Sequence, residues 1–211
     1  MRVKLLLASS NHGKLREFRA LAAECSGEIE IDLLPCFSQF PTFSEDAPTF
    51  AENAAGKALH YSRFTNEIVV ADDSGLVVAS LGGAPGVRSA RYAGENATDQ
   101  ERNAKLLAAL REERDASRTA QFVCVIAAAK QGKMLAVVSD SVDGVIAKEP
   151  RGTNGFGYDP LFCFPPLKKT FAGLTGEEKN LHSHRGKAFR RLPHALFSSN
   201  TAGETHPANS L

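Results

Sequence analysis

Apolar and polar positions along this chain form blocks that alternate between the spacing of strands and the spacing of helices. Residues 3–8 are a mostly apolar run with the length of a buried strand. Residues 14–24 switch to helical spacing, with Leu15, Phe18 and Leu21 on one stripe. The first part of the chain therefore predicts a strand, a tight polar loop and a helix in direct succession.

Three threonines mark the starts of further helices. Thr49, Thr98 and Thr175 each stand three residues before a glutamate, which is the capping-box signature. The first of these helices is expected to run to about residue 62. It carries Asn53 and Lys57 on one face, because four residues separate them.

Short apolar runs bounded by turn residues predict further strands. The predicted strands lie at residues 68–71, 121–129, 134–139, 142–147 and 161–164, and residues 76–79 continue as strand or turn. Residues 184–197 are expected to form a last helix, which Pro193 is expected to kink. Gln131-Gly132-Lys133 separates two of the strands and predicts a hairpin turn. Residues 152–160 are expected to be a loop, because three glycines and a proline interrupt both periodicities.

The order of these elements predicts an α/β fold. Strands and helices alternate early and a hairpin follows, which favours a mixed sheet; a purely parallel, doubly wound sheet is the alternative. Regular segments extend to about residue 197 and predict one domain over residues 1–197. Residues 198–211 are small, polar and aperiodic, and are expected to form a disordered tail.

Composition narrows the class of protein. The 211 residues include 25 Lys and Arg against 24 Asp and Glu, and the net charge of +1 argues against a dedicated duplex-binding or membrane-surface protein. No apolar run is long enough to cross a bilayer, and residues 1–7 are too short for a signal peptide. The four cysteines lack the spacing of zinc or thioredoxin motifs, so we expect free thiols and a cytoplasmic protein.

The polar loop after the first strand is a candidate phosphate site. Residues 9–14 place backbone N–H groups, a helix N-terminus and the charge of Lys14 together, a combination that favours an anion. The segment is not a P-loop, because Ala8 stands at the position of the first glycine and Leu15 at that of the Ser or Thr. The alternative is a plain strand–helix turn with a solvated lysine.

The adjacent carboxylates of Asp72 and Asp73 are a candidate metal site. At the end of a buried strand such a pair is costly unless a cation or hydrogen bonds offset the repulsion. Mg²⁺ suits one or two carboxylates together with substrate phosphate, and a carboxylate beside it can accept a proton from water. The alternative is an Asx turn that closes the strand. Two more residues are candidates for this site. Glu45 is either a second metal ligand or an ordinary loop acid, and Lys57 is either a phosphate ligand or a solvated helix lysine.

Residues 154–160 and the basic residues that follow form a candidate base site. Glycines around Phe156 leave its ring free to stack on a nucleobase, and such stacking is worth about 1–3 kcal/mol. The alternative is that Phe156 and Tyr158 are buried core residues of a glycine-rich turn. Lys179 and Arg185 are donors without acceptors, so they suit a 6-oxo purine better than a 6-amino one. The alternative is the basic start of a helix.

Taken in this order, the motifs resemble the inosine triphosphate pyrophosphatase family, the noncanonical purine nucleoside triphosphate pyrophosphatases. The matching stretches are residues 8–14 with Glu17, 49–58, 71–75, 81–92, 155–160 and 177–179 through 183–186. Any one of them is weak, but six in register are specific, and the resemblance covers roughly residues 3–197.

The resemblance implies a Mg²⁺-dependent hydrolase that converts ITP, dITP and XTP to the monophosphate and pyrophosphate and so cleanses the nucleotide pool. It also implies a homodimer, and an elongated mixed sheet flanked by helices with the active site in a cleft between two lobes.

The resemblance also assigns roles to residues. Asp73 is the expected general base and metal ligand, supported by Asp72, and Glu45 the expected second metal ligand, although Ser44 stands where many relatives carry an acid. The expected substrate contacts are Ser9, Ser10, Asn11, His12, Gly13, Lys14 and Lys57 for the phosphates and sugar, Ser74, then Phe156, Gly157, Tyr158 and Asp159 around the base, and Lys179, His184 and Arg185 at its 6-oxo edge.

Three other functions stay open at this point. One is a pyrophosphatase for other modified nucleotides, pyrimidine or methylated. Another is a single-strand nucleic-acid binder, which would need a continuous basic track and no carboxylate pair. The third is a regulator that binds nucleotide without turnover.

Overall fold

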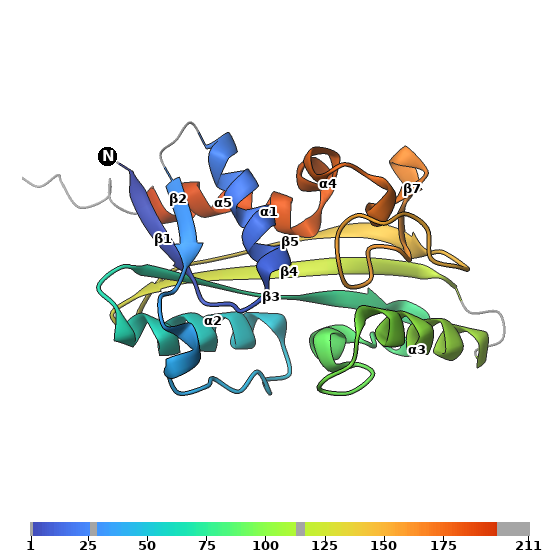
Figure 1. The fold of residues 1–211 in the computed structure, drawn as a ribbon, viewed down its shortest axis with the longest axis horizontal. Helices are drawn as coiled ribbons and strands as arrows, with labels where there is room; N and C mark the ends of the chain where they lie inside the picture. The colour runs from blue at the N-terminus through green and yellow to red at the C-terminus, as the bar shows by residue number, and fades with distance from the viewer. Residues whose placement is uncertain (1, 26–28, 113–116, 198–211) are drawn as a thin grey trace, which may run out of the picture.

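A seven-stranded mixed sheet is the centre of the molecule (Figure 1). The computed structural model describes residues 2–25, 29–112 and 117–197. The strands are β1 (Val3–Leu7), β2 (Ile29–Leu33), β3 (Ile68–Val78), β4 (Thr119–Lys130), β5 (Lys133–Ile146), β6 (Phe162–Phe164) and β7 (Lys169–Thr170), in the order β2-β1-β3-β4-β5-β6-β7. β1 pairs in parallel with β2 and β3, and the remaining pairs are antiparallel. The mixed sheet is confirmed, and the purely parallel alternative is wrong.

The long strands give the sheet its elongated shape (Figure 1). β3 was expected to end at Asp72, but it continues to Val78, because β4 pairs with it from Val69 to that point. The two strands predicted at 134–139 and 142–147 are likewise one strand, β5, paired along β4. The predicted hairpin is confirmed: Gln131 and Gly132 both have positive φ, as the two-residue turn requires.

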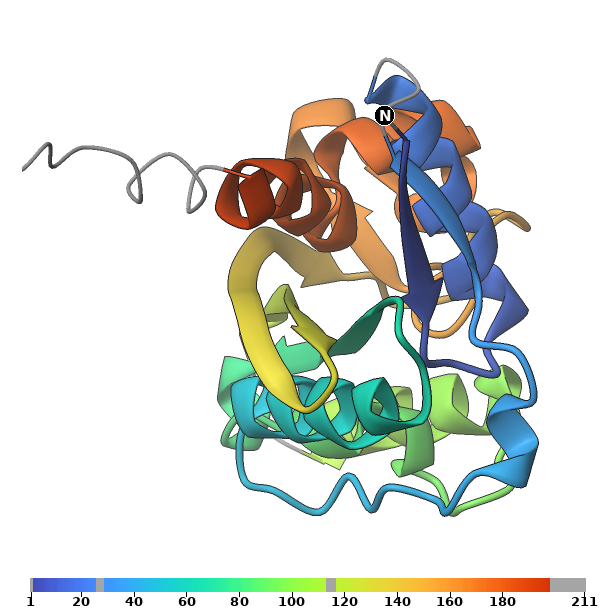
Figure 2. The ribbon, with the colours of Figure 1, turned by 90° about the vertical axis from the view of Figure 1, so that its left-hand side faces the viewer.

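Helices cover both faces of the sheet. α1 (His12–Glu24) and α5 (His184–Phe197) pack on one face, where Phe18 and Phe189 meet edge to face at 5.7 Å. α2 (Phe50–Tyr61) buries Ala54 and Ala58 on the other face. α3 (Asp99–Glu112) packs in a third cluster with Leu76 and Phe122, and α4 (Gly176–His182) lies beside α5 (Figures 1 and 2).

The helix starts follow the capping signals. Thr98 and Thr175 make reciprocal capping boxes with their glutamates. At Thr49 the box is partial, because Glu52 accepts from the threonine hydroxyl at 2.6 Å instead of from its backbone N–H. α5 continues through Pro193.

Some features were not predicted or lie outside the description. The edge strand β2 was missed, although Ile29, Ile31 and Leu33 alternate with acidic residues. The expected tail, residues 198–211, lies outside the described residues. In the described part of the chain, no helix combines the length and the apolar character that crossing a membrane requires. The four cysteines are free, as expected.

Candidate active site

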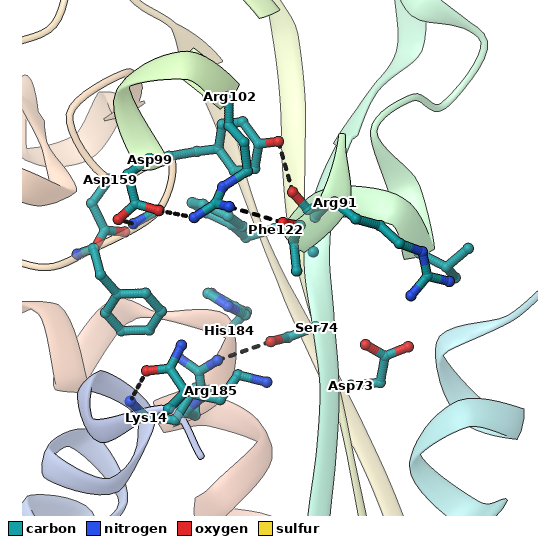
Figure 3. Close-up of a pocket in the computed structure, with 18 of the residues that line it drawn as sticks. Lys14, Asp73, Ser74, Arg91, Asp99, Arg102, Phe122, Asp159, His184 and Arg185 are labelled. Atoms are coloured by element: carbon teal, nitrogen blue, oxygen red, sulfur yellow. Dashed lines mark hydrogen bonds and ion pairs between the residues drawn. The ribbon is translucent and has the colours of Figure 1, made fainter. Parts of the chain in front are cut away.

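A cavity of about 420 Å³ lies between the helices on the two sides of β3 (Figure 3). Its walls come from the start of α1, the segment before α2, β3, the 3-10 segment Gly86–Arg91 (η4), α3, β4, the loop before β6, α4 and α5. The predicted site residues among its lining are Asn11, Lys14, Glu45, Asp73, Ser74, Phe156, Gly157, Tyr158, Asp159, Lys179, His184 and Arg185. The fold therefore brings together residues from opposite ends of the chain, from Asn11 to Arg185.

Asp72 and Asp73 point to opposite sides of β3, because consecutive side chains on a strand alternate. Asp72 Oδ2 faces α1 and α5, with Lys14 Nζ at 3.0 Å and Arg185 Nη2 at 3.2 Å. Asp73 Oδ2 faces α2, where Asn53 Nδ2 donates to it at 3.0 Å. The prediction that the pair closes a strand is wrong, and only Asp73 lines the cavity.

Asp72 is held as a carboxylate. Its side chain is fully buried, which alone would raise its pKa, but the charges of Lys14 and Arg185 outweigh burial and hold the pKa well below its ordinary value. Ser74 Oγ donates to the same oxygen at 3.1 Å. Such a group does not accept a proton near neutral pH; it fixes the two cations instead.

Asp73 has the opposite electrostatics. Burial raises its pKa to about 6; the hydrogen bond from Asn53 works against this, and the negative charge of Glu45 adds to it. A carboxylate with a pKa near the working pH suits general-base chemistry.

Glu45 and Lys57 form a pair at the same end of the cavity. Lys57 Nζ donates to Glu45 Oε1 at 2.6 Å and to the Asp72 carbonyl at 2.9 Å. Burial alone would lower the pKa of Lys57, but Glu45 and Asp72 outweigh it and raise that pKa. Glu45 lines the cavity, whereas Lys57 lies behind it with its amine engaged.

The donor set fits a hard divalent cation held together with substrate. Asp73 and Glu45 present carboxylate oxygens to one cavity, and Mg²⁺ commonly takes one or two carboxylates plus phosphate and water. Within residues 2–25, 29–112 and 117–197 there is no cluster of three or more His, Cys, Asp or Glu that could hold a metal by itself.

The predicted phosphate loop reaches the cavity at two of its residues. Asn11 caps α1 by accepting from Lys14 N at 3.0 Å, and both residues line the cavity. Ser9 and Ser10 in the loop, and His12 and Gly13 in the first turn of α1, lie outside the lining. Gly13 has a distinct reason to be glycine: a Cβ there would lie 2.8 Å from Phe156 Cδ1.

The loop around Phe156 is held by hydrogen bonds within the loop and to α3. Phe156 N donates to Asp159 Oδ2 at 2.8 Å, and Gly157 N donates to Asp99 Oδ2 at 2.7 Å. The Phe156 ring is half-buried, with Lys179 Nζ 4.8 Å from its centre. Tyr158 is buried and donates to the Ser89 carbonyl, so it is a core residue that also lines the cavity.

Glu17 organises the two cations at this end of the cavity. It accepts from Lys179 Nζ at 2.6 Å and also from Arg185 Nη1. Burial alone would lower the pKa of Lys179, but Asp159 and Glu17 outweigh it and raise the pKa, so the amine stays charged. Glu17 was not predicted as a site residue, although it lies one helical turn from Lys14, on the same face.

His184 is a neutral ring in the cavity wall. Burial lowers its pKa well below the ordinary value, and Arg185 and Lys179 lower it further. The ring stacks on Phe122 at 4.7 Å, and among the described residues its Nδ1 has no partner. Phe122, Arg91, Asp99 and Arg102 also line the cavity and were not predicted as site residues, although Arg91 lies in the matching stretch 81–92 (Figure 3).

Comparisons with known proteins point in the same direction. The model of the Ham1 family matches residues 5–195. A dITP/XTP pyrophosphatase of Desulforamulus reducens is 47% identical over 197 residues, covering 92% of this chain and 96% of the relative. One of Geobacillus kaustophilus is 49% identical over 189 residues, covering 90% and 92%. The solved structure of a HAM1 protein from Coxiella burnetii superposes with a TM-score of 0.82 at 43% identity, covering 93% of this chain and 99% of that one.

Proposed function

Because the chain belongs to the Ham1 family, we propose that it is a nucleoside triphosphate pyrophosphatase. It hydrolyses the noncanonical purine nucleotides dITP, ITP and XTP to the monophosphate and pyrophosphate, which removes them from the nucleotide pool. The names of the relatives above favour this substrate class over modified pyrimidine triphosphates.

The observation that carries the proposal is the division of the cavity into an acidic end and a cationic, aromatic end. Asp73 lies at one side of the cavity, whereas Arg185 lies at the other, with its guanidinium carbon 5.7 Å from the centre of the Phe156 ring (Figure 3). A purine nucleotide has the matching polarity, with a flat base at one end and a metal-binding triphosphate at the other. A nucleic-acid binder would not need the carboxylates of Asp73 and Glu45.

The chain's own residues account for hydrolysis at the α phosphorus. Asp73 accepts the proton of the attacking water, since its carboxylate is ionised near pH 7 yet retains affinity for a proton. Lys14, at the start of α1, neutralises charge that develops on the phosphate oxygens. The family resemblance assigns the phosphates and sugar to Ser9, Ser10, Asn11, His12 and Gly13, and Lys57 adds its positive charge beside the phosphates while it stays paired with Glu45.

A divalent cation is the cofactor that membership in the family implies, and we assign Mg²⁺. Asp73 and Glu45 would hold it. When bound, it supplies charge neutralisation to the triphosphate and to the leaving pyrophosphate.

The other end of the cavity selects the base. Phe156 stacks on the purine, and Lys179 and Arg185 donate to a 6-oxo group. A 6-amino group would bring a donor against these donors, so ATP is rejected. His184 adds a neutral donor or acceptor at the same edge.

A pyrophosphate-release assay over ITP, XTP, ATP, GTP and dTTP, with and without Mg²⁺, tests this function. We expect release from ITP and XTP that a chelator abolishes, and little release from ATP and dTTP. GTP shares the 6-oxo group, so its release relative to that from ITP measures how strongly the 2-amino group is rejected. Equal release from dTTP would favour a pyrophosphatase of other specificity, and tight ITP binding without release would favour a regulator.

We also propose that the enzyme is a homodimer in the cytoplasm. The family resemblance supports the dimer, and the four free cysteines suit a reducing compartment. Light scattering on the purified protein tests the dimer directly.

A further inference from the structure

Asn53 on α2 is a completely buried asparagine whose amide is used at both ends. Its Nδ2 donates to Asp73 Oδ2 at 3.0 Å and to the Ala47 carbonyl at 3.3 Å. Its Oδ1 accepts from the Ala47 N–H at 3.0 Å. Rotating the amide by half a turn would bring its NH₂ group against the Ala47 N–H and its oxygen against the Asp73 carboxylate and the Ala47 carbonyl. These partners therefore also fix the orientation of the amide.

These bonds connect the two carboxylates of the cavity. Ala47 lies two residues after Glu45, in the segment that leads into α2, and Asn53 binds both backbone groups of Ala47. The same amide occupies only one oxygen of Asp73. Among the described residues, Asp73 Oδ1 takes no hydrogen bond, and Asp73 and Glu45 line one cavity.

We propose that Asn53 is a positioning residue for the divalent-cation site: it fixes the Asp73 carboxylate relative to the Glu45 segment and leaves Asp73 Oδ1 directed to the cation. The proposal rests on the proposed function, which supplies the cation. Two like charges in one cavity separate unless other groups hold them. Lys57 holds the Glu45 side chain, and Asn53 does the same for Asp73.

Residues that orient a metal ligand typically change metal affinity or activity by about 10- to 100-fold when they are removed. A merely structural asparagine would instead lower stability and leave the affinity for metal unchanged. Ser62 is the matched control: it is fully buried just after α2, donates to the Leu59 carbonyl and accepts from Gly132 N, and does not line the cavity.

Binding of Mn²⁺ to the full-length protein in the presence of a non-hydrolysable α,β-imido analogue of ITP, followed by electron paramagnetic resonance, provides the test. We expect Asn53→Ala and the nearly isosteric Asn53→Leu to bind Mn²⁺ roughly 10- to 100-fold more weakly than wild type. Ser62→Ala should bind as wild type does. The proposal would be overturned if an Asn53 variant that melts cooperatively bound Mn²⁺ with wild-type affinity. It would also be overturned if Ser62→Ala weakened Mn²⁺ binding equally, or if the wild-type protein bound no Mn²⁺.

A second measurement needs no substitution, in case both Asn53 variants fail to fold. The side-chain amide signal of Asn53 in an NMR spectrum of the wild-type protein should broaden at substoichiometric Mn²⁺. An unaffected Asn53 signal would overturn the proposal.

Failure of this proposal is distinguishable from failure of the proposed function. Dependence of Mn²⁺ binding on Asn53 in a protein that releases no pyrophosphate from ITP would reject the function alone. Pyrophosphate release with Mn²⁺ binding indifferent to Asn53 would reject the positioning role alone.

Discussion

Asp72 and Asp73 are neighbours on β3 whose carboxylates lie on opposite faces of the strand, one between two cations and the other against a neutral amide. Two residues of the same type therefore have opposite pKa shifts, and they are expected to respond in opposite ways to the same substitution.

Asp73→Asn should abolish turnover while leaving nucleotide binding intact. The amide keeps the size of the side chain but cannot accept a proton from water, so we expect kcat for ITP to fall by about 10²- to 10⁴-fold. Binding of ITP, measured by calorimetry with Ca²⁺ in place of Mg²⁺, should stay within a few-fold of wild type. Retained turnover would remove Asp73 from its catalytic role.

The same variant should make the metal-free protein more stable at alkaline pH. The folded pKa of Asp73 is about 6 against an ordinary 3.8, so between these pH values the unfolded chain releases a proton that the folded protein keeps. The cost to stability grows as pH rises through this window and is complete above it, at most about 3 kcal/mol. Urea unfolding in a chelator should show Asp73→Asn stabilised at pH 8 and unchanged near pH 4.

Asp72→Asn should destabilise the protein at pH 7. Its folded pKa is depressed, so the carboxylate contributes stability above its unfolded pKa, and this contribution is lost as the pH falls. Removing a buried charge that pairs with Lys14 and Arg185 should lower the free energy of unfolding by about 3 kcal/mol. This value is near the low end for breaking a buried ion pair, because Arg185 still pairs with Glu17 in the variant. A variant as stable as wild type in urea at pH 7 would contradict the assignment.

Arg185→Ala should reduce discrimination between ITP and ATP. The guanidinium supplies a donor at the 6-oxo edge, so we expect kcat/KM for ITP to fall and its ratio to that for ATP to drop by about tenfold or more. Arg191→Ala is the control, since Arg191 lies on the same helix but is largely exposed and pairs with Asp140. An unchanged ratio in Arg185→Ala would show that another group reads the base.

Gly13→Ala should weaken substrate binding by moving Phe156. The new methyl would lie 2.8 Å from Phe156 Cδ1, so the ring must shift from the position in which it stacks on the base. We expect KM for ITP to rise by several-fold, up to about tenfold if the stacking energy of 1–3 kcal/mol is half lost. The rise should be much smaller in a Phe156→Ala background, and equal effects in both backgrounds would show that the two residues act independently.

Local patterns predicted most elements because local physics determines them. Capping boxes at Thr98 and Thr175 mark true helix starts, and Gln131 and Gly132 form the predicted turn. The continuation of β3 through Asp72 and Asp73 was not predictable locally, since it depends on pairing with β4 and on cations supplied by α1 and α5.

The same distinction holds for the site. Residues in recognisable motifs, such as Lys14, Asp73 and Arg185, were found from sequence and meet in one cavity. Glu17 and Asn53 were not assigned to the site, because their contribution lies in contacts with residues far along the chain. Glu17 meets Arg185 across 168 positions, and Asn53 meets Asp73 across 20.

The central claim, selective hydrolysis of noncanonical purine triphosphates at the α phosphorus, is tested most directly by competition. ITP and ATP are mixed in equal amounts with the enzyme and Mg²⁺, and the nucleotide products are separated and quantified over time. We predict IMP and pyrophosphate in equal amounts while ATP stays intact. Formation of IDP and phosphate, or of AMP at the same rate as IMP, would contradict the account.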